Sequence, residues 1–369
     1  MTEAADIVII GGGFAGAATA YHLTEHGARG VVVLEAEPRP GVHASGKNAA
    51  LCFQIIDDAD EAGLAIEGTE VYACPPDQLA AAPLLRRCGS LLLATERAPL
   101  QGALDQADAL GIAASILPRE EVVRQIPLLA DSPFTAALHN PEDGVVDIAR
   151  LLEGYLGAAR RRGARIRCGE PVTGFGVNGG RIESVTTASG TIATRCVVDA
   201  AGAWAGEIAR LAGALACPIL PRRRHIYQLS PATRIDDGWP FVWHAEIDAY
   251  FRPEQGGIVA SACDASEHPV RAPIVDMAAE TDLRAKLAAA FPGLGQPALV
   301  EARACLRTFS ADGHFMIGRD PAIEGFFWVA ALGGHGMSTS YAVGRLASEA
   351  ITGERSSLLD RFAPGRFRT

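Results

Sequence analysis

The sequence predicts a mixed α/β protein (α+β overall), in which a discontinuous domain of strands and helices is interrupted by an inserted domain built on an antiparallel or mixed β-sheet plus helices. Three strand–glycine–helix units, at the start, middle and end of the chain, predict the first domain. Proline and glycine turns between apolar strands over 216–308 predict the second. We expect 1–85, 145–215 and 309–369 to form the first domain, and 86–144 and 216–308 the second, substrate-binding one.

The first unit spans residues 6–35, with the apolar run Ile7–Ile10 leading into a glycine turn and a helix. Its glycines, Gly11, Gly13 and Gly16, have the spacing G-x-G-x-x-G, and Glu35 ends the next strand 19 residues later. The first glycine allows the sharp turn, the second lets a pyrophosphate touch the backbone, and the third lets the helix lie close to the strand. The helix N-terminus then faces the phosphates. A Rossmann-like dinucleotide site is expected, with Glu35 binding an unphosphorylated ribose.

Composition limits the classes of partner. With 369 residues and 49% hydrophobic content the chain can form two packed domains, and its net charge of −10 argues against nucleic acid as a partner. The eight cysteines show no C-x-x-C pair or zinc-type spacing, so we expect reduced thiols and no metal site. No export signal or spanning apolar run is evident, which favours a cytoplasmic protein and leaves peripheral inner-membrane contact open.

The segments between the glycine units are expected as follows. A turn-rich stretch over 38–51 leads into a helix, and 59–82 is a surface-facing helix broken at Pro75-Pro76. A strand over 88–94, helices around 99–111 and 118–125, a strand near Ile116 and a strand and turn over 136–147 form substrate-side structure. A helix is expected after Asp147, and a meander of strands over 165–190. The second glycine unit begins at Val197 and continues as a helix over 205–212; strands follow at 224–229, 240–243, 250–252 and 257–262, and a helix at 276–290. The third glycine unit, 325–337, leads into a helix that runs to Ile351.

A single NAD-type domain seldom needs three separated units, and the chain resembles the D-amino acid oxidase and dehydrogenase family of FAD enzymes, which includes glycine and sarcosine oxidases. The motifs that carry this resemblance are the N-terminal glycines with Glu35, the loop 41–50, the segment 198–204 (VDAAGAW), the segment 306–313 (LRTFSADG) and the segment 333–336 (GGHG). The resemblance covers nearly the whole chain and implies FAD as cofactor.

The expected cofactor residues lie in or beside these motifs. They are Gly11, Gly13, Phe14, Ala15, Gly16, Glu35, Ala36, Ser45, Gly46, Lys47, Asn48, Ala49, Ala50, Val172, Ala201, Gly202, Trp204, Arg307, Gly333, Gly334, His335, Gly336, Met337 and Ser338. Ser45, Lys47 and Asn48 offer donors for phosphate or ribitol oxygens, although a solvated loop is the alternative for this stretch. The helix after Gly336 is expected to point its positive end at the flavin N1–C2=O region.

The chain is most similar to the bacterial D-arginine dehydrogenase type of that family, and this likeness implies the substrate residues. Arg307 and Tyr250 would hold the substrate carboxylate, with Arg223 as a further arginine. The alternatives are a structural ion pair for Arg307, a core tyrosine for Tyr250, and a register shift among Arg222–Arg224. The remaining substrate positions are Leu51, Phe53, Ile56 and Ser90. Because Ser90 stands where an acid would meet a basic side chain, a neutral or apolar amino acid or an N-substituted glycine is expected.

The expected reaction is oxidative deamination by hydride transfer from the substrate Cα–H to flavin N5, which gives an imine and then a 2-oxo acid. His335 would contact flavin or substrate, accept the amine proton, or serve structurally. FAD is expected to bind without a covalent bond; a flavin linked to Cys305, or less readily to His43, is the alternative. A 2-hydroxy acid dehydrogenase and a non-catalytic flavoprotein are the rival functions. The sequence leaves open the exact substrate and its chirality, O₂ or a quinone- or dye-type carrier as electron acceptor, and the oligomeric state.

Overall fold

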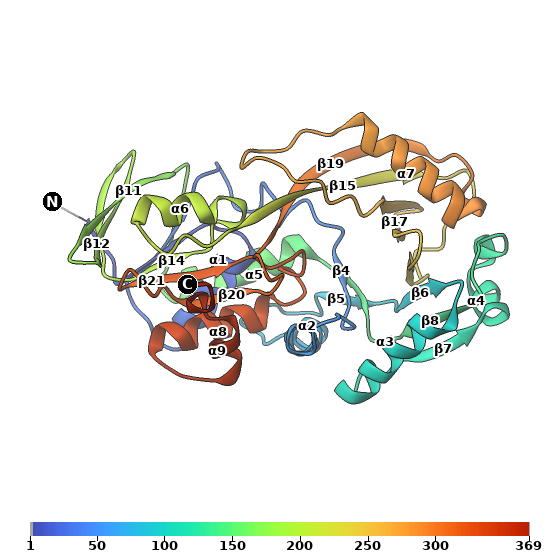
Figure 1. Cartoon of the computed structure of the whole chain (residues 1–369), viewed down its shortest axis with the longest axis horizontal. Helices are drawn as coiled ribbons and strands as arrows, with labels where there is room; N and C mark the ends of the chain where they lie inside the picture. The colour runs from blue at the N-terminus through green and yellow to red at the C-terminus, as the bar shows by residue number, and fades with distance from the viewer. Residues whose placement is uncertain (1–2, 369) are drawn as a thin grey trace.

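The computed structural model describes residues 3–368 and arranges them as four sheets with helices packed against them (Figure 1). The strands are β1 (Glu3–Ala4), β2 (Ile7–Ile10), β3 (Val31–Glu35), β4 (Leu51–Cys52), β5 (Leu85–Arg87), β6 (Ser90–Ala94), β7 (Ser115–Pro118), β8 (Ala136–Asn140), β9 (Gly144–Val146), β10 (Arg165–Cys168), β11 (Val172–Asn178), β12 (Arg181–Thr187), β13 (Gly190–Ala193), β14 (Val197–Asp199), β15 (Leu220–Ser230), β16 (Phe241–His244), β17 (Ala249–Glu254), β18 (Gly257–Ser261), β19 (Ala298–Phe309), β20 (Met316–Arg319) and β21 (Phe326–Ala330). The helices are α1 (Phe14–Glu25), α2 (Ala59–Ala73), α3 (Arg97–Leu110), α4 (Arg119–Gln125), α5 (Ile148–Arg161), α6 (Ala205–Ala212), α7 (Met277–Ala290), α8 (Ser340–Thr352) and α9 (Ser357–Phe362), with 3₁₀ turns η1 (Pro127–Leu129), η2 (Gly202–Trp204), η3 (Pro292–Leu294) and η4 (Pro364–Phe367).

A six-stranded sheet of order β10-β3-β2-β14-β21-β20 carries the three glycine units, and only β20 runs antiparallel to its neighbour. Its central strands are continuous Val/Ile runs because both faces are covered. Helices α1, α5 and α8 pack on one face, and α6 with the four-stranded sheet β1-β13-β12-β11 packs on the other. The predicted Rossmann-like fold class is confirmed.

A second, eight-stranded sheet has the order β19-β15-β18-β17-β16-β6-β8-β7 and is antiparallel except between β16 and β6. Helix α7 and the short turns η1 and η3 close an apolar core on one of its faces. The long strands β15 and β19 pair along most of their length and run in Figure 1 from the α6 side of the molecule to α7. This pair therefore connects the nucleotide-type sheet to the inserted sheet.

The structure corrects three local expectations. The turn-rich stretch 38–51 leads into the short strand β4 and not into a helix: Asn48 caps the loop, donating to Ser45 O at 2.8 Å and accepting from Ala50 N at 2.7 Å, and Ala50 has a φ of 62°. Helix α2 is not wholly surface-facing, since Leu64 and Tyr72 on it are buried. The last helix, α8, begins only at Ser340, after turns that follow Gly336.

None of the helices described in residues 3–368 is long and apolar enough to cross a membrane.

Candidate active site

A cavity of about 440 Å³ opens at the carboxyl ends of the parallel strands β2, β3, β14 and β21, and β15 and β19 close its other side. Open α/β sheets bind their ligands at this edge. The expected cofactor residues that line it are Gly11, Gly13, Phe14, Ala15, Glu35, Ala36, Ser45, Asn48, Ala49, Val172, Ala201, Gly202, Trp204, Arg307, Gly334, Gly336 and Met337. Gly16, Gly46, Lys47, Ala50, Gly333, His335 and Ser338 lie in the same segments but do not line the cavity itself.

The turn after β2 can pass close to the backbone that follows β14 only because Gly11 is a glycine. Gly11 has a φ of 103°, and a Cβ there would lie 2.4 Å from Ala200 O. Helix α1 starts at Gly13 with no side-chain cap and no acid in its first turn, so its positive end is not neutralised. This end faces the cavity, as a pyrophosphate requires.

Glu35 is held in place by backbone donors at the end of β3. Its Oε2 accepts from Gly12 N and its Oε1 from Glu37 N, each at 2.9 Å. The Oγ of Ser45 accepts from Phe14 N at 3.0 Å, which fixes that hydroxyl beside the first turn of α1. An anchored acid for a ribose, an exposed helix N-terminus for a pyrophosphate and a long cavity between them fit a dinucleotide such as FAD.

The cavity wall opposite α1 carries two arginines that lack acidic partners. Arg222 pairs with Arg307, and Arg224 with Cys305, across β15 and β19, so Arg224 and Arg307 project from the same face. Both line the cavity, and among residues 3–368 no carboxylate lies within ion-pair distance of either. The Nε and Nη1 of Arg224 are buried without a hydrogen-bond partner. Burial, followed by the charge of Arg224, lowers the pKa of Arg307.

Gly334 brings the third glycine unit against this wall. A Cβ at Gly334 would lie 2.9 Å from Cζ of Arg307, and its φ is 100°. No other residue can let the guanidinium pass so close to the turn. The glycine-rich segment therefore also serves to position Arg307.

Aromatic rings continue from this turn into the inserted sheet. Phe53 lies 5.4 Å from the His335 ring and 6.1 Å from Trp243, and Trp243 lies 5.0 Å from Tyr250. Burial, and then the Arg307 charge, lowers the pKa of His335 to about 4, so its imidazole is neutral at pH 7. Burial raises the pKa of Tyr250 to about 12, which keeps its phenol protonated. The charges of Arg307 and Arg224 oppose this rise in the pKa of Tyr250.

The structure does not bring every expected substrate residue to this wall. Arg223 points to the opposite face of β15 and binds Asp276 at 2.7 Å, and Arg224 takes the place at the cavity. Leu51 packs in the same apolar cluster as Tyr250, whereas Ile56 packs against α2. Alternation along a strand predicts that neighbours face opposite sides, but only the pairing with β19 shows which side is the cavity.

Ser90 is bound to a buried acid that sequence reasoning missed. Its Oγ donates to Asp143 Oδ2 at 2.7 Å, while Asp143 Oδ1 accepts from Gln54 N at 3.1 Å, Gln54 Nε2 at 3.4 Å and Asn140 Nδ2 at 2.9 Å. Burial raises the pKa of Asp143 to about 7, against the opposing effect of these donors. Because Gln54 follows Phe53, Asp143 holds the segment that presents the aromatic ring. Asp143 lies in the turn after β8, outside every motif that the sequence shows, so the sequence alone did not indicate its role.

A second missed residue, His225, holds a loop at the cavity. Pro273 of the segment 264–276 lines the cavity. His225 Nε2 accepts from Asp276 N at 3.0 Å, so Nδ1 carries the proton and donates to Asp264 Oδ2 at 2.7 Å. One buried imidazole therefore fixes both ends of this loop.

The two candidate attachment residues both line the cavity. Cys305 is buried, and burial raises the pKa of its thiol. The His43 ring lies 4.5 Å from the Trp204 ring at an interplanar angle of 46°, and its Nε2 lies 2.8 Å from Glu37 Oε1. The protonated thiol is the less reactive form of a cysteine.

The comparisons with known proteins agree with this geometry. Residues 6–350 match the model of the family described as DAO, FAD dependent oxidoreductase. The chain belongs to this family. The match establishes FAD as the cofactor and does not single out the D-arginine dehydrogenase type expected from the sequence.

Curated relatives are similar at moderate identity. The chain is 26% identical over 364 residues to the mitochondrial pyruvate dehydrogenase phosphatase regulatory subunit of Mus musculus, covering 94% of this chain and 41% of that protein. It is 29% identical over 263 residues to mitochondrial sarcosine dehydrogenase of Homo sapiens, covering 68% of this chain and 28% of that protein. The chain thus spans less than half the length of these two relatives.

Solved structures resemble the chain over its whole length. L-proline dehydrogenase from P. horikoshii has a TM-score of 0.90 at 24% identity, covering 100% of this chain and 99% of its own, which shows the fold. Iminodiacetate oxidase from Chelativorans sp. BNC1 has a TM-score of 0.81 at 26% identity, covering 97% of this chain and 98% of its own. These likenesses over the whole chain agree with the family match.

Proposed function

We propose that this protein oxidises the Cα–N bond of a small amino acid with a neutral or apolar substituent, of the D-amino acid or N-substituted glycine type. The observation that carries the proposal is the arginine wall, formed by Arg224 and Arg307. Two buried guanidiniums without acidic partners at a cavity wall favour an anionic ligand, and a planar guanidinium binds a carboxylate through two parallel hydrogen bonds.

Residues near the arginine wall would bind the rest of the substrate and exclude water from it. The protonated phenol of Tyr250 donates to the carboxylate beside Arg307. The neutral imidazole of His335, whose Nδ1 is buried without a hydrogen-bond partner, accepts a hydrogen bond from the substrate amine. Phe53 and Trp243 exclude water and fill the space over an apolar substituent. FAD supplies the acceptor for the hydride that leaves the substrate Cα.

The choice of substrate rests on the aromatic rings of Phe53 and Trp243 and on the relatives. The acid beside Ser90, Asp143, accepts hydrogen bonds from Ser90, Gln54 and Asn140 and does not line the cavity, so it does not face a basic side chain there. Two of the similar proteins are named for N-substituted glycines, sarcosine dehydrogenase and iminodiacetate oxidase. An N-substituted glycine therefore has the stronger support within the proposed class.

The test is an anaerobic titration of the purified flavoprotein with D-, L- and N-methyl amino acids and with 2-hydroxy acids, followed by absorbance. We expect N-methylglycines or small apolar D-amino acids to bleach the flavin band near about 450 nm. Bleaching by 2-hydroxy acids alone would replace the proposal with a hydroxy acid dehydrogenase. Failure of every compound would indicate a non-catalytic flavoprotein. Rapid return of colour in air would identify an oxidase, and slow return a dehydrogenase.

A further inference from the structure

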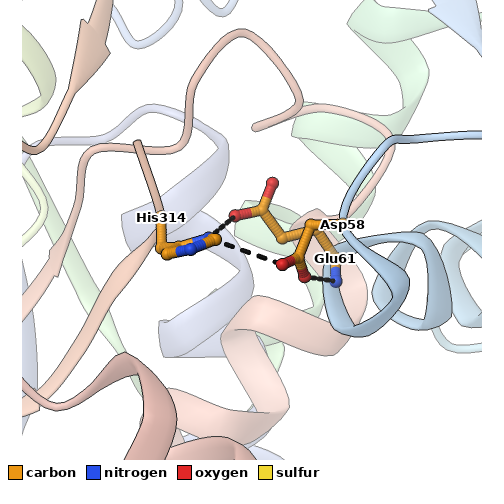
Figure 2. Close-up of side chains that lie close together, drawn as sticks. All are labelled: Asp58, Glu61 and His314. Atoms are coloured by element: carbon orange, nitrogen blue, oxygen red, sulfur yellow. Dashed lines mark hydrogen bonds and ion pairs between the residues drawn. The ribbon is translucent and has the colours of Figure 1, made fainter. Parts of the chain in front are cut away.

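Two carboxylates and an imidazole meet outside the cavity, at the N-terminal end of α2. Asp58 is the N-cap of this helix, Glu61 lies in its first turn, and His314 comes from the connection between β19 and β20 (Figure 2). One ligand-type atom from each residue lies within 4.8 Å of the other two. None of the three residues lines the cavity.

The distances in this cluster fit shared coordination better than hydrogen bonding. His314 Nδ1 lies 3.5 Å from Asp58 Oδ2 and 3.5 Å from Glu61 Oε1. A charge-assisted N–H···O bond is normally about 2.7–2.9 Å long. Two ligands of one tetrahedral cation, each about 2.0–2.2 Å from it, lie about 3.4 Å apart. The imidazole is therefore at the right distance from both carboxylates to share an ion with them.

Glu61 gives an independent indication of a missing partner. Its side chain is only 8% exposed, it faces His314, and its Oε1 is buried without a hydrogen bond. An unpaired buried carboxylate is costly unless a cation or proton compensates it.

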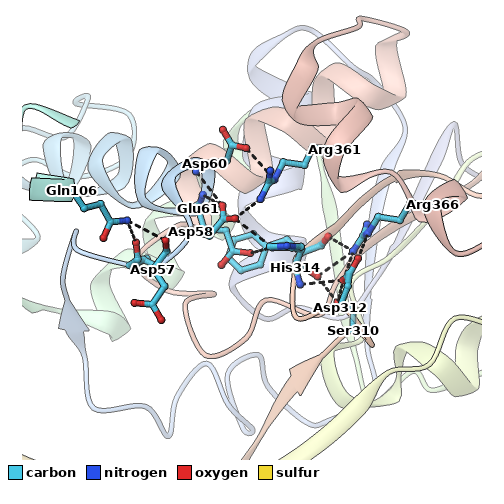
Figure 3. Close-up of polar contacts among 12 residues, drawn as sticks. Asp57, Asp58, Asp60, Glu61, Gln106, Ser310, Asp312, His314, Arg361 and Arg366 are labelled. Carbon is cyan, nitrogen blue, oxygen red and sulfur yellow. Dashed lines mark hydrogen bonds and ion pairs between the residues drawn. The ribbon is translucent and has the colours of Figure 1, made fainter. Parts of the chain in front are cut away.

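The neighbouring ion pairs do not supply that charge. Figure 3 shows Arg361 between Asp58 and Asp60: its Nη2 donates to Asp58 Oδ2, the oxygen that also faces His314, and its Nε lies 3.0 Å from Asp60 Oδ2. Asp58 Oδ1 is already used as the helix cap, accepting from Asp60 N and Glu61 N at 3.0 Å. Arg366, farther along in Figure 3, pairs with Asp312 at 2.7 Å. Asp58, Asp60 and Glu61 therefore share one guanidinium, which leaves two negative charges that a divalent cation would neutralise.

We propose that Asp58 Oδ2, Glu61 Oε1 and His314 Nδ1 form a binding site for a first-row divalent cation such as Mn²⁺ or Zn²⁺. Mixed nitrogen and carboxylate donors without a thiolate suit these ions, and water completes the coordination on the His314 side. The ion joins α2 to the β19–β20 connection and, through Arg361, to α9. It is separate from the cavity and from the proposed redox reaction.

The probe is Mn²⁺ added to the FAD-loaded protein after treatment with a chelator, with loss of the free-ion EPR signal as the readout. Mn²⁺ is chosen because thiols bind it poorly and the chain has eight free cysteines. We expect one Mn²⁺ per chain. Glu61→Gln and His314→Gln each weaken binding at least about tenfold, whereas Asp60→Asn, on the same helix turn, changes it less than about threefold.

Two results overturn the proposal: no stoichiometric Mn²⁺ binding by the wild-type protein, or equal affinity in Glu61→Gln, His314→Gln and wild type. Retained FAD and an unchanged circular dichroism spectrum confirm that each variant folds. If Glu61→Gln fails to fold, His314→Gln decides the question, because the His314 side chain is 36% exposed and tolerates replacement.

Discussion

Asp143 and the arginine wall are both buried charges, but the protein treats them in opposite ways. Asp143 is 2% exposed and receives hydrogen bonds from Ser90, Gln54 and Asn140. Arg224 is 6% exposed, lines a cavity and leaves two of its nitrogens without a partner. A buried charge without a partner costs several kcal/mol. We infer from this difference that Asp143 stabilises the fold, whereas Arg224 is available to bind a ligand.

The largest effect is expected for Arg307→Met, because it removes the central guanidinium of the wall. Loss of one partner from a buried charge pair costs about 3–5 kcal/mol, so kcat/KM for the identified substrate should fall by about 100-fold or more. The melting temperature should stay equal or rise, since no acid in the protein loses its partner. Steady-state kinetics and thermal unfolding measure both. Arg303→Lys, on the same strand, is the control; a fall of less than about threefold for Arg307→Met contradicts the ligand role.

The neighbouring residues Arg224 and Arg223 give a matched pair. Arg224→Gln should raise KM about tenfold or more, because a charge-assisted hydrogen bond of about 1.5–3 kcal/mol is lost. Arg223→Gln removes only a partly solvated pair with Asp276 and should change KM less than about twofold. Equal effects of the two substitutions would mean that the strand register does not select the ligand-binding arginine.

Asp143→Asn tests the structural role of Asp143, because the ionisation of this carboxyl should make the stability of the protein depend on pH. The pKa of Asp143 is raised to about 7 from its usual value near about 4, so between these pH values the folded state binds more protons than the unfolded state. This group therefore makes the protein less stable as pH rises from about 4 to 7, by up to about 1.4 kcal/mol per pH unit. Denaturant unfolding at pH 5 and 7 should show a weaker pH dependence in Asp143→Asn than in wild type. Identical slopes would show that Asp143 is ionised throughout.

The smallest effect is expected for Cys305→Ser. Its thiol lies at the cavity wall but is buried and protonated, so FAD should be retained equally by variant and wild type. Acid precipitation should release yellow FAD into the supernatant from both proteins. Flavin that stays with the wild-type precipitate and is released from Cys305→Ser would establish the covalent bond instead.

The sequence by itself determined the features that short-range geometry dictates. Gly11 at a φ of 103°, the buried β2 and the anchored Glu35 follow from spacing within 30 residues, and the family model covers the same motifs. Only glycine can occupy such a turn, so the motif is legible without a structure. The same reasoning indicated Arg307, whose neighbours resemble those of a known family.

Only the tertiary structure decided which distant residues meet. Arg224 rather than Arg223 faces the cavity because β15 pairs with β19 in a particular register, and a shift of one residue would exchange the two. Asp143 reaches Ser90, and His314 reaches Glu61, across separations of 53 and 253 residues. Such contacts depend on long-range packing, which local periodicity does not encode. Burial, which turns these side chains into functional groups, is likewise a property of the whole fold.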